Sequence, residues 1–469
     1  MASLLHKLLR TLTPASNNRR RKPRKRPATP APQPIEERLE GLPLEGIRHI
    51  RFGHYSDNNR TPAQKRLWGE AEAQFKEGRY RDSIVTLLRY LYDDREKAVS
   101  WTIDEEGKLH FRIAQGSSMV KGTFDGAFVH ACVPLARTEN PGTAVMRRLL
   151  ELNYELRYTS VGMDEKGIFH FVFDTSAATA SPEKLFEGLQ ELALKSDRQD
   201  DTLMTDFSDL EPMPRAPVNE LPRQELEAKW KAFQRWTQHS LDLAASFDND
   251  TYAGAIAHIY LTTVYKLDFL LSPVGKLMLE LERISGLYWK QKEGTPLVWR
   301  NQQMRSALTA LLGWNREDLS ACLQSPRSTF ALTDNPRPEK MRDNILTALR
   351  DAETYRSRQQ GELALKLVAF GPLYNQYLYS LPDVVSNLTL ILCAVLHPRY
   401  FADLGLKEAF CDPDTGKPAA ELIKATVRTL IAAEKDTFPA LALDLSKVNF
   451  SDRYSFAHSY AAQLAQLAI

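Results

Sequence analysis

Two stretches of this 469-residue sequence combine residue types that could do chemistry, IDEEGKLHFRI at 103–113 and MDEKGIFHFVF at 163–173. Each holds an aspartate, an acidic turn with a glycine, and a histidine six residues after the aspartate. Two histidines and two carboxylates that met in space could bind a metal ion. The repeat is therefore either a duplicated site or a duplicated piece of architecture.

The spacing favours architecture. Asp104 and Asp164 lie at the start of a loop, where a carboxylate can accept backbone N–H bonds. His110 and His170 alternate with apolar residues, so we expect them on the more polar face of a sheet. Each histidine lies on the opposite strand of the hairpin from its aspartate. We therefore expect that a second structural element is needed to bring these side chains together. The sequence has no H-x-x-H or H-E-x-x-H pattern. We predict no metal ion and no catalytic role here, and the approach of His110 to His170 stays open.

Other catalytic patterns are also missing. The sequence contains no G-x-x-x-x-G-K-[ST], no G-x-G-x-x-G and no G-x-S-x-G. Its four cysteines are far apart and form no C-x-x-C pair, which is typical of a reducing compartment. We therefore predict a cytoplasmic, non-enzymatic protein without a cofactor.

The second half of the chain has many aromatic residues. We expect them to fill the core of a helical bundle, and a binding groove is the alternative. They are Trp230, Trp236, Tyr252, Tyr260, Tyr265, Tyr288, Trp289 and Trp299. For the isolated histidines of this half we expect structural or surface roles. These are His239, His258, His397 and His458.

The amino terminus is strongly basic. Residues 1–35 hold nine lysines and arginines and no acid, and the rest of the chain has 52 basic and 59 acidic residues, a net charge of −7. Because this segment is also rich in proline, we predict that residues 1–50 are a disordered tail with a short amphipathic start. The basic run could contact the anionic inner face of the membrane. It has no aromatic residues that could stack on bases, so we expect that it does not bind nucleic acid. Its members are Arg19, Arg20, Arg21, Lys22, Arg24, Lys25 and Arg26.

Periodicity predicts an α+β fold. Ordered structure should begin near Thr61 with two helices, and from Val99 the apolar period changes to two. Strands, a helix over 143–153, a second hairpin and a helix after Ser181 follow. We predict an antiparallel sheet with flanking helices over 61–204. A proline-rich linker over 205–222 then leads to a separate all-α domain over 223–469, without strands.

The stretches AVMRRLLELNYELRYTSVGMDEKGIFHFVFDT and SPEKLFEGLQELALKSDRQDDTL support a family comparison. Their pattern resembles the YbjN-like, type III secretion chaperone-like (Tir chaperone-type) domain over about residues 61–204. That resemblance implies a compact α+β fold, often homodimeric, that binds protein partners and catalyses nothing. It does not extend into the helical half.

The helix over 143–153 has two apolar stripes, one with Val145, Leu149 and Leu152 and one with Met146 and Leu150. Such a helix can cover its own sheet and still offer a surface to a second subunit or another protein. We predict a protein-binding module, chaperone-like or regulatory. The alternatives are a peripheral membrane scaffold tethered by the basic run, and an enzyme whose site lies in the helical half.

Overall fold

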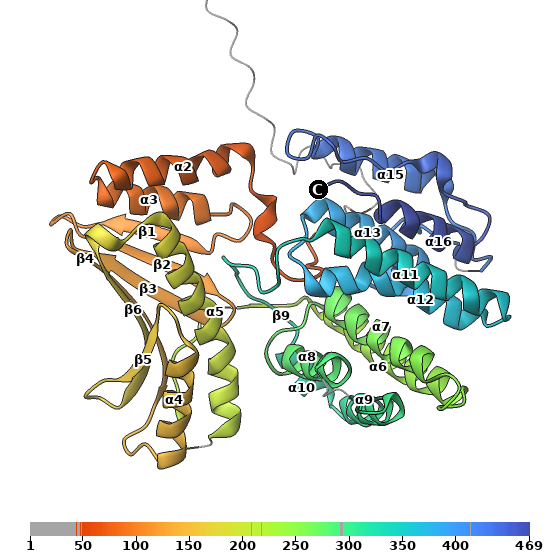
Figure 1. Ribbon diagram of the computed structural model, residues 1–469, viewed down its shortest axis with the longest axis horizontal. Helices are drawn as coiled ribbons and strands as arrows, with labels where there is room; N and C mark the ends of the chain where they lie inside the picture. Colours follow the sequence, from red (N-terminus) through yellow and green to blue (C-terminus); the bar gives the residue numbers. More distant parts are fainter. Residues whose placement is uncertain are drawn as a thin grey trace, which may run out of the picture. The chain divides into compact units, whose positions relative to one another are not determined.

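The computed structural model describes Leu44, Ile47 and residues 49–207, 209–216, 218–290, 294–412 and 414–469. The described residues belong to one compact unit. It contains a seven-stranded antiparallel sheet with flanking helices and a large helical region, which confirms the predicted α+β class. We call residues 62–212 the sheet half and residues 223–469 the helical half (Figure 1).

The two repeated stretches form two hairpins of one sheet, as predicted. Neighbouring strands follow the order β1-β2-β3-β4-β6-β5, and the short β7 pairs with the end of β4. Between β3 and β4 the turn contains Gly126, whose φ of 100° suits glycine. The strands are β1 (Val99–Ile103), β2 (Leu109–Gln115), β3 (Ser118–Phe124), β4 (Phe128–Arg137), β5 (Ser160–Met163), β6 (Ile168–Ser176) and β7 (Glu211–Pro212).

One face of the sheet is covered by helices. The long α5 packs on β2, β3, β4 and β6, and α4 packs on β5 (Figure 1). Gly188 of α5 lets the helix approach closely, because a Cβ there would lie 2.3 Å from the Phe173 ring. Thr61 and Ser181 cap α2 and α5 as their sequences predicted. The helices of this half are α2 (Pro62–Lys76), α3 (Tyr80–Leu91), α4 (Thr143–Glu155) and α5 (Pro182–Asp206), with the 3₁₀ turn η3 (Ala177–Thr179).

The helical half consists mainly of helices, as the sequence predicts. Most of them are long, and α10 and α14 have six residues each. Gly371 and Pro372 lie inside α12, where a Cβ on Gly371 would lie 2.5 Å from Ile345 Cα of α11. The Gly-Pro pair therefore marks a close helix contact and not a helix end. The helices are α6 (Arg223–Ala245), α7 (Ala253–Leu271), α8 (Gly275–Trp289), α9 (Leu297–Leu312), α10 (Arg316–Ala321), α11 (Pro338–Ser357), α12 (Gly361–Leu378), α13 (Asp383–Leu396), α14 (Pro398–Asp403), α15 (Ala420–Ala433) and α16 (Arg453–Leu464), with the 3₁₀ turn η4 (Leu445–Lys447).

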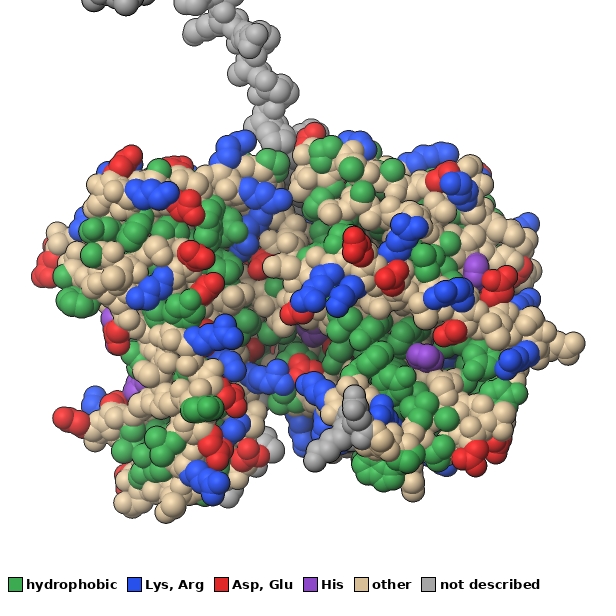
Figure 2. All heavy atoms as spheres, viewed as in Figure 1, with side chains coloured by type: hydrophobic (Ala, Val, Ile, Leu, Met, Phe, Trp, Pro, Cys, Tyr) green, Lys and Arg blue, Asp and Glu red, His purple; other side chains and the backbone are tan. Residues whose placement is uncertain are grey.

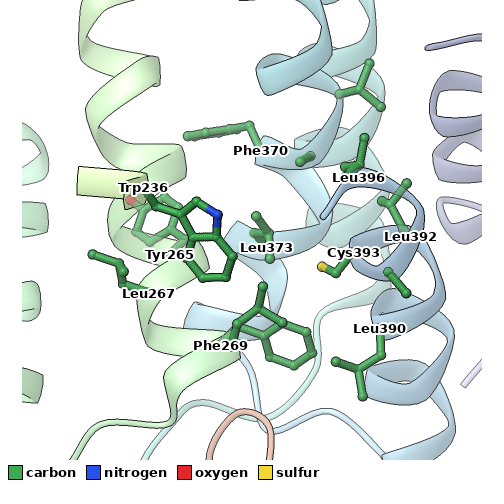
Figure 3. Close-up of a cluster of buried hydrophobic side chains, with 14 of the residues drawn as sticks. Trp236, Tyr265, Leu267, Phe269, Phe370, Leu373, Leu390, Leu392, Cys393 and Leu396 are labelled. Atoms are coloured by element: carbon green, nitrogen blue, oxygen red, sulfur yellow. The ribbon is translucent and has the colours of Figure 1, made fainter. Parts of the chain in front are cut away.

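The core of the helical half includes many of the aromatic residues noted in the sequence. Trp236, Tyr260 and Tyr265 are buried, whereas Trp289 and Trp299 are nearly half exposed. Figure 3 shows Trp236 of α6 among side chains of α7, α12 and α13. The apolar run over 384–396 lies in α13, and all its residues except Ser386 and Asn387 are buried.

The segment between the halves is hydrogen-bonded to its surroundings. Ala216 donates its N–H to the Ser117 carbonyl at 2.7 Å, and β7 pairs with β4. The two-residue strand β8 (Asn219–Glu220) pairs with β9 (Gln324–Ser325). The expectation that no strand occurs after residue 223 is therefore wrong at β9. Two residues are too few to show a period in the sequence.

A loop of the helical half enters the core of the sheet half. We call residues 326–330 the strap. Gln115 accepts the N–H groups of Thr329 and Phe330 at 3.0 and 2.9 Å and donates to the Phe330 carbonyl at 3.2 Å. The Phe330 ring is fully buried and meets Phe186 of α5 edge to face. The strap joins the halves through the Gly116–Arg327 β-bridge, the Gln115 side chain and a buried aromatic ring.

Packing begins before the predicted start at Thr61. Leu44, Ile47 and Ile50 are buried in the core of the helical half. Gly53 donates its N–H to the Phe269 carbonyl at 2.7 Å, and the 3₁₀ turn η2 (Asp57–Asn59) follows. Three apolar residues at spacings of three in an otherwise polar stretch are a weak signal, so the sequence did not reveal this contact.

Candidate functional site

The first Asp–His pair closes its own hairpin. Asp104 Oδ1 accepts the N–H groups of Glu106 and Lys108 at 3.1 and 2.8 Å, and its Oδ2 lies 2.9 Å from His110 Nε2. Gly107 supplies the positive φ of 79° that this turn needs. One carboxylate thus satisfies the turn backbone and the imidazole together.

The second pair repeats this geometry. Asp164 Oδ1 accepts the N–H groups of Lys166 and Ile168, both at 2.9 Å, and Oδ2 lies 3.1 Å from His170 Nε2. The expectation that each histidine needs a second element to meet its aspartate is wrong. The histidine is near the start of the returning strand, so the aspartate at the turn reaches it on the same face.

The two pairs do not converge. β3 and β4 lie between β2 and β6, so His110 and His170 are separated by three strand spacings, about 14 Å across the sheet. A third pair lies between them, with His130 Nδ1 2.5 Å from Asp174 Oδ1 across β4 and β6. No group of three potential ligands suited to a metal ion occurs among the described residues. The two repeated stretches therefore form two separate hairpins of one sheet.

The sequence missed the His130–Asp174 pair because it joins residues on different strands. His130 lies between the buried Val129 and Ala131, so the alternation of apolar residues indicates that it is exposed. The alternation does not indicate the register of β4 with β6, which brings His130 next to Asp174. The outer sheet face therefore presents three exposed or partly exposed Asp–His pairs. Lys121 of β3 lies exposed on this face as well.

The turn aspartates should make stability depend on pH. The hydrogen bond from His110 is the largest influence that lowers the pKa of Asp104, and the N–H of Ile168 is the largest that lowers the pKa of Asp164. A carboxyl group whose pKa falls on folding stabilises the folded state at pH values above its pKa in the unfolded chain, here 3.8. This contribution is lost as the pH drops through the lower pKa of the folded state.

We therefore expect the wild-type chain to be more stable than a variant with Asp104→Asn and Asp164→Asn at pH 5–7, and the difference to shrink below pH 4. Urea unfolding across this pH range measures it. The exposed Asp250→Asn serves as the control. A difference that persists unchanged at pH 3 would contradict the assigned role of the carboxylates.

The helix α4 separates the two stripes named in the sequence. Val145, Leu149 and Leu152 are buried in the core of the sheet half. Met146 and Leu150 face outward with 38% and 69% of their surface exposed. Tyr154, one turn further, continues this outer stripe with 93% of its surface exposed. We call Met146, Leu150 and Tyr154 the α4 stripe. Tyr154 was not part of the sequence prediction, although the spacing of four from Leu150 was visible there.

Two polar contacts hold α4 in place. Asn153 donates its amide to the Val161 carbonyl at 2.9 Å and accepts the Val161 N–H at 2.7 Å, which pairs the outer edge of β5. Glu191 of α5 accepts the N–H groups of Arg157, Tyr158 and Thr159 at 2.8–2.9 Å. The loop after α4 is thus fixed to α5, and the α4 stripe is presented on a rigid support.

Each of the four isolated histidines contacts a carboxylate or an aromatic ring. His239 Nε2 lies 2.7 Å from Glu362, and the His258 ring packs on Phe370. His397 packs on Trp236, and the ring of His458 packs on that of Tyr454. The basic run over 19–26 lies outside the described residues. On the face shown in Figure 2, basic and acidic side chains are interspersed with hydrophobic ones.

Within the described ranges, none of the helices combines the length and apolar character that a membrane span requires. Comparison with known proteins found no matching family model, no matching curated protein and no matching solved structure. The resemblance to the YbjN-like, secretion chaperone-like domain therefore stays a prediction that rests on the sequence pattern and the order of elements.

Proposed function

We propose that this protein is a non-enzymatic protein-binding module, chaperone-like or regulatory, and that its partner docks on the α4 stripe. The observation that carries the proposal is the exposure of three large side chains in line on one helix, Met146, Leu150 and Tyr154. Fully burying a leucine or methionine side chain contributes about 1.5–3 kcal/mol, so a partner that covers them gains substantial free energy.

The setting of α4 supports this proposal. Asn153 and Glu191 hold the helix and its following loop in one conformation, so little conformational entropy is lost when a partner binds. Tyrosine is enriched among residues that dominate binding energy at interfaces. Arg147 and Glu151 flank the stripe and pair with each other at 3.2 Å. A surface with both charges suits a second copy of this chain or another protein with a mixed helix face.

We expect Leu150→Asp to weaken partner binding by at least about tenfold, because it places a charge in the centre of an apolar contact. Light scattering measures the mass of the full chain in solution, and affinity capture from cell lysate identifies other partners. Phe128→Asp is the matched control, since Phe128 is 59% exposed on the outer sheet face.

The proposal would be supported if the wild type formed a dimer, or captured one protein, and this binding were lost in Leu150→Asp but retained in Phe128→Asp. A dimer would indicate self-association, and a captured protein would indicate a different partner. The proposal would be contradicted if the Leu150→Asp variant bound its partner as well as the wild type. It would also be contradicted if the wild-type chain were a monomer and captured the same proteins as the Leu150→Asp variant. A cytoplasmic location remains part of the proposal, and the four described cysteines, all free thiols, agree with it. No observation on the described residues favours the membrane tether or an enzymatic site.

A further inference from the structure

The strap contacts the sheet half largely through its backbone, as a short peptide ligand would. The Arg327 carbonyl accepts the Gly116 N–H at 3.0 Å, and the Ser328 N–H donates to the Glu96 carboxylate at 2.9 Å. The backbone groups of the next two residues bond to the side-chain amide of Gln115. Backbone hydrogen bonds of this kind give affinity for an extended peptide whatever its side chains are.

Two side chains of the strap add a preference for particular residue types. The Thr329 hydroxyl donates to the Ala114 carbonyl at 2.9 Å. The Phe330 ring is enclosed in the apolar core of the sheet half, next to Phe186, whose own ring lies 5.7 Å from that of Trp68. The site therefore suits a hydroxyl residue that is followed by an aromatic residue.

Gln115 is placed to receive a peptide backbone. It is the last residue of β2 and is 1% exposed. Its side-chain oxygen accepts two N–H groups of the strap, and its side-chain nitrogen donates to the Phe330 carbonyl. A buried amide is costly when its hydrogen bonds are lost. If the strap leaves, this amide therefore favours the entry of another peptide.

The strap is part of a long loop that is fixed on both sides. Residues 322–337 connect α10 to α11, and loops of this length in compact proteins are commonly functional. Before the strap, β9 pairs with β8, and after it the Asp334 N–H donates to the Leu378 carbonyl of α12 at 3.1 Å. In Figure 1 the loop that contains β9 lies between the two halves. Only the residues between these two anchors need to move for the strap to leave, and such local opening does not require global unfolding.

We propose that the sheet half has a binding site for an extended peptide of another protein, with a hydroxyl residue before phenylalanine, and that the strap occupies this site as an internal ligand. The strap competes with an external peptide at an effective concentration of the order of 1 mM, so it keeps the site closed against weak ligands. The site is separate from the α4 stripe, and its test does not depend on the partner proposed for that helix.

The first test is fluorescence anisotropy with a labelled synthetic peptide, SPRSTFAL, which has the sequence of residues 325–332. In the full-chain variant Phe330→Ala the strap loses its aromatic ring, so we expect this variant to bind the peptide at least about tenfold more tightly than the wild type does. The control peptide SPRSTAAL, without the phenylalanine, should bind the same variant at least about tenfold more weakly than SPRSTFAL. Adding Gln115→Ala should abolish binding, and Leu332→Ala should bind as weakly as the wild type.

Hydrogen exchange of the wild-type chain provides a second readout, which needs no substitution. A peptide that displaces the strap should speed up exchange of the Thr329 and Phe330 amides, which are hydrogen-bonded to Gln115. Faster exchange with SPRSTFAL and not with SPRSTAAL supports the proposal. Equal binding of the two peptides by a folded Phe330→Ala variant would overturn it. If that variant does not fold, exchange that stays unchanged at peptide concentrations of the order of 1 mM rules the proposal out.

Discussion

Phe330→Ala is expected to lower the free energy of unfolding by about 3–5 kcal/mol, because it removes a fully buried aromatic ring. The ring is fully buried in the core of the sheet half, although the residue belongs to a loop of the helical half. Its removal leaves a cavity beside Phe186 that the strap cannot close while Gln115 holds its backbone.

Urea unfolding followed by circular dichroism measures this change, and limited proteolysis near residue 330 reports whether the strap detaches. Leu332→Ala is the matched control, because Leu332 is two residues away and 43% exposed. We expect it to change stability by less than about 0.5 kcal/mol. A loss below about 1 kcal/mol for Phe330→Ala would show that the strap does not hold the two halves together.

The second large effect concerns the buried ion pair of α6. Replacing Lys229 by methionine is expected to cost about 3–5 kcal/mol, because it leaves the Glu225 carboxylate buried and unpaired. The double variant Glu225→Leu, Lys229→Met should recover most of this loss, since an apolar pair of similar volume avoids the desolvation of both charges.

The same helix supplies the control. Lys231 and Glu227 have the same spacing of four residues, but their side chains are 59% and 37% exposed. Lys231→Met should therefore change the free energy of unfolding by less than about 1 kcal/mol. The three variants are compared by urea unfolding at pH 7. Equal costs for Lys229→Met and Lys231→Met, or a double variant as unstable as Lys229→Met, would contradict the role of burial.

The order and type of the elements could be predicted from the sequence because their signals are local. Phe169, Phe171 and Phe173 alternate on one strand, and all three are buried. Thr61 with Gln64 forms a capping box, and the spacing of three residues that it requires is visible in the sequence. Such signals depend on neighbours within a few residues, so one chain without any tertiary information displays them.

The candidate site was predictable only in part. The two stripes of α4 followed from helical periodicity, but which stripe faces the core depended on where the sheet lies. The aspartates at the hairpin turns were identified as acceptors of backbone N–H groups, which the structure confirms. Their contact with His110 and His170 was not predicted, because side-chain reach across a hairpin depends on register and twist.

The sequence by itself determined the α+β class, the two hairpins and the change to helices after residue 222, because hydrophobic periods and caps are written in adjacent residues. Only the tertiary structure decided which distant residues meet. Phe330 reaches Gln115 across 215 positions, and Lys266 meets Trp236 between two helices. These contacts depend on how whole elements pack, and no local pattern carries that information.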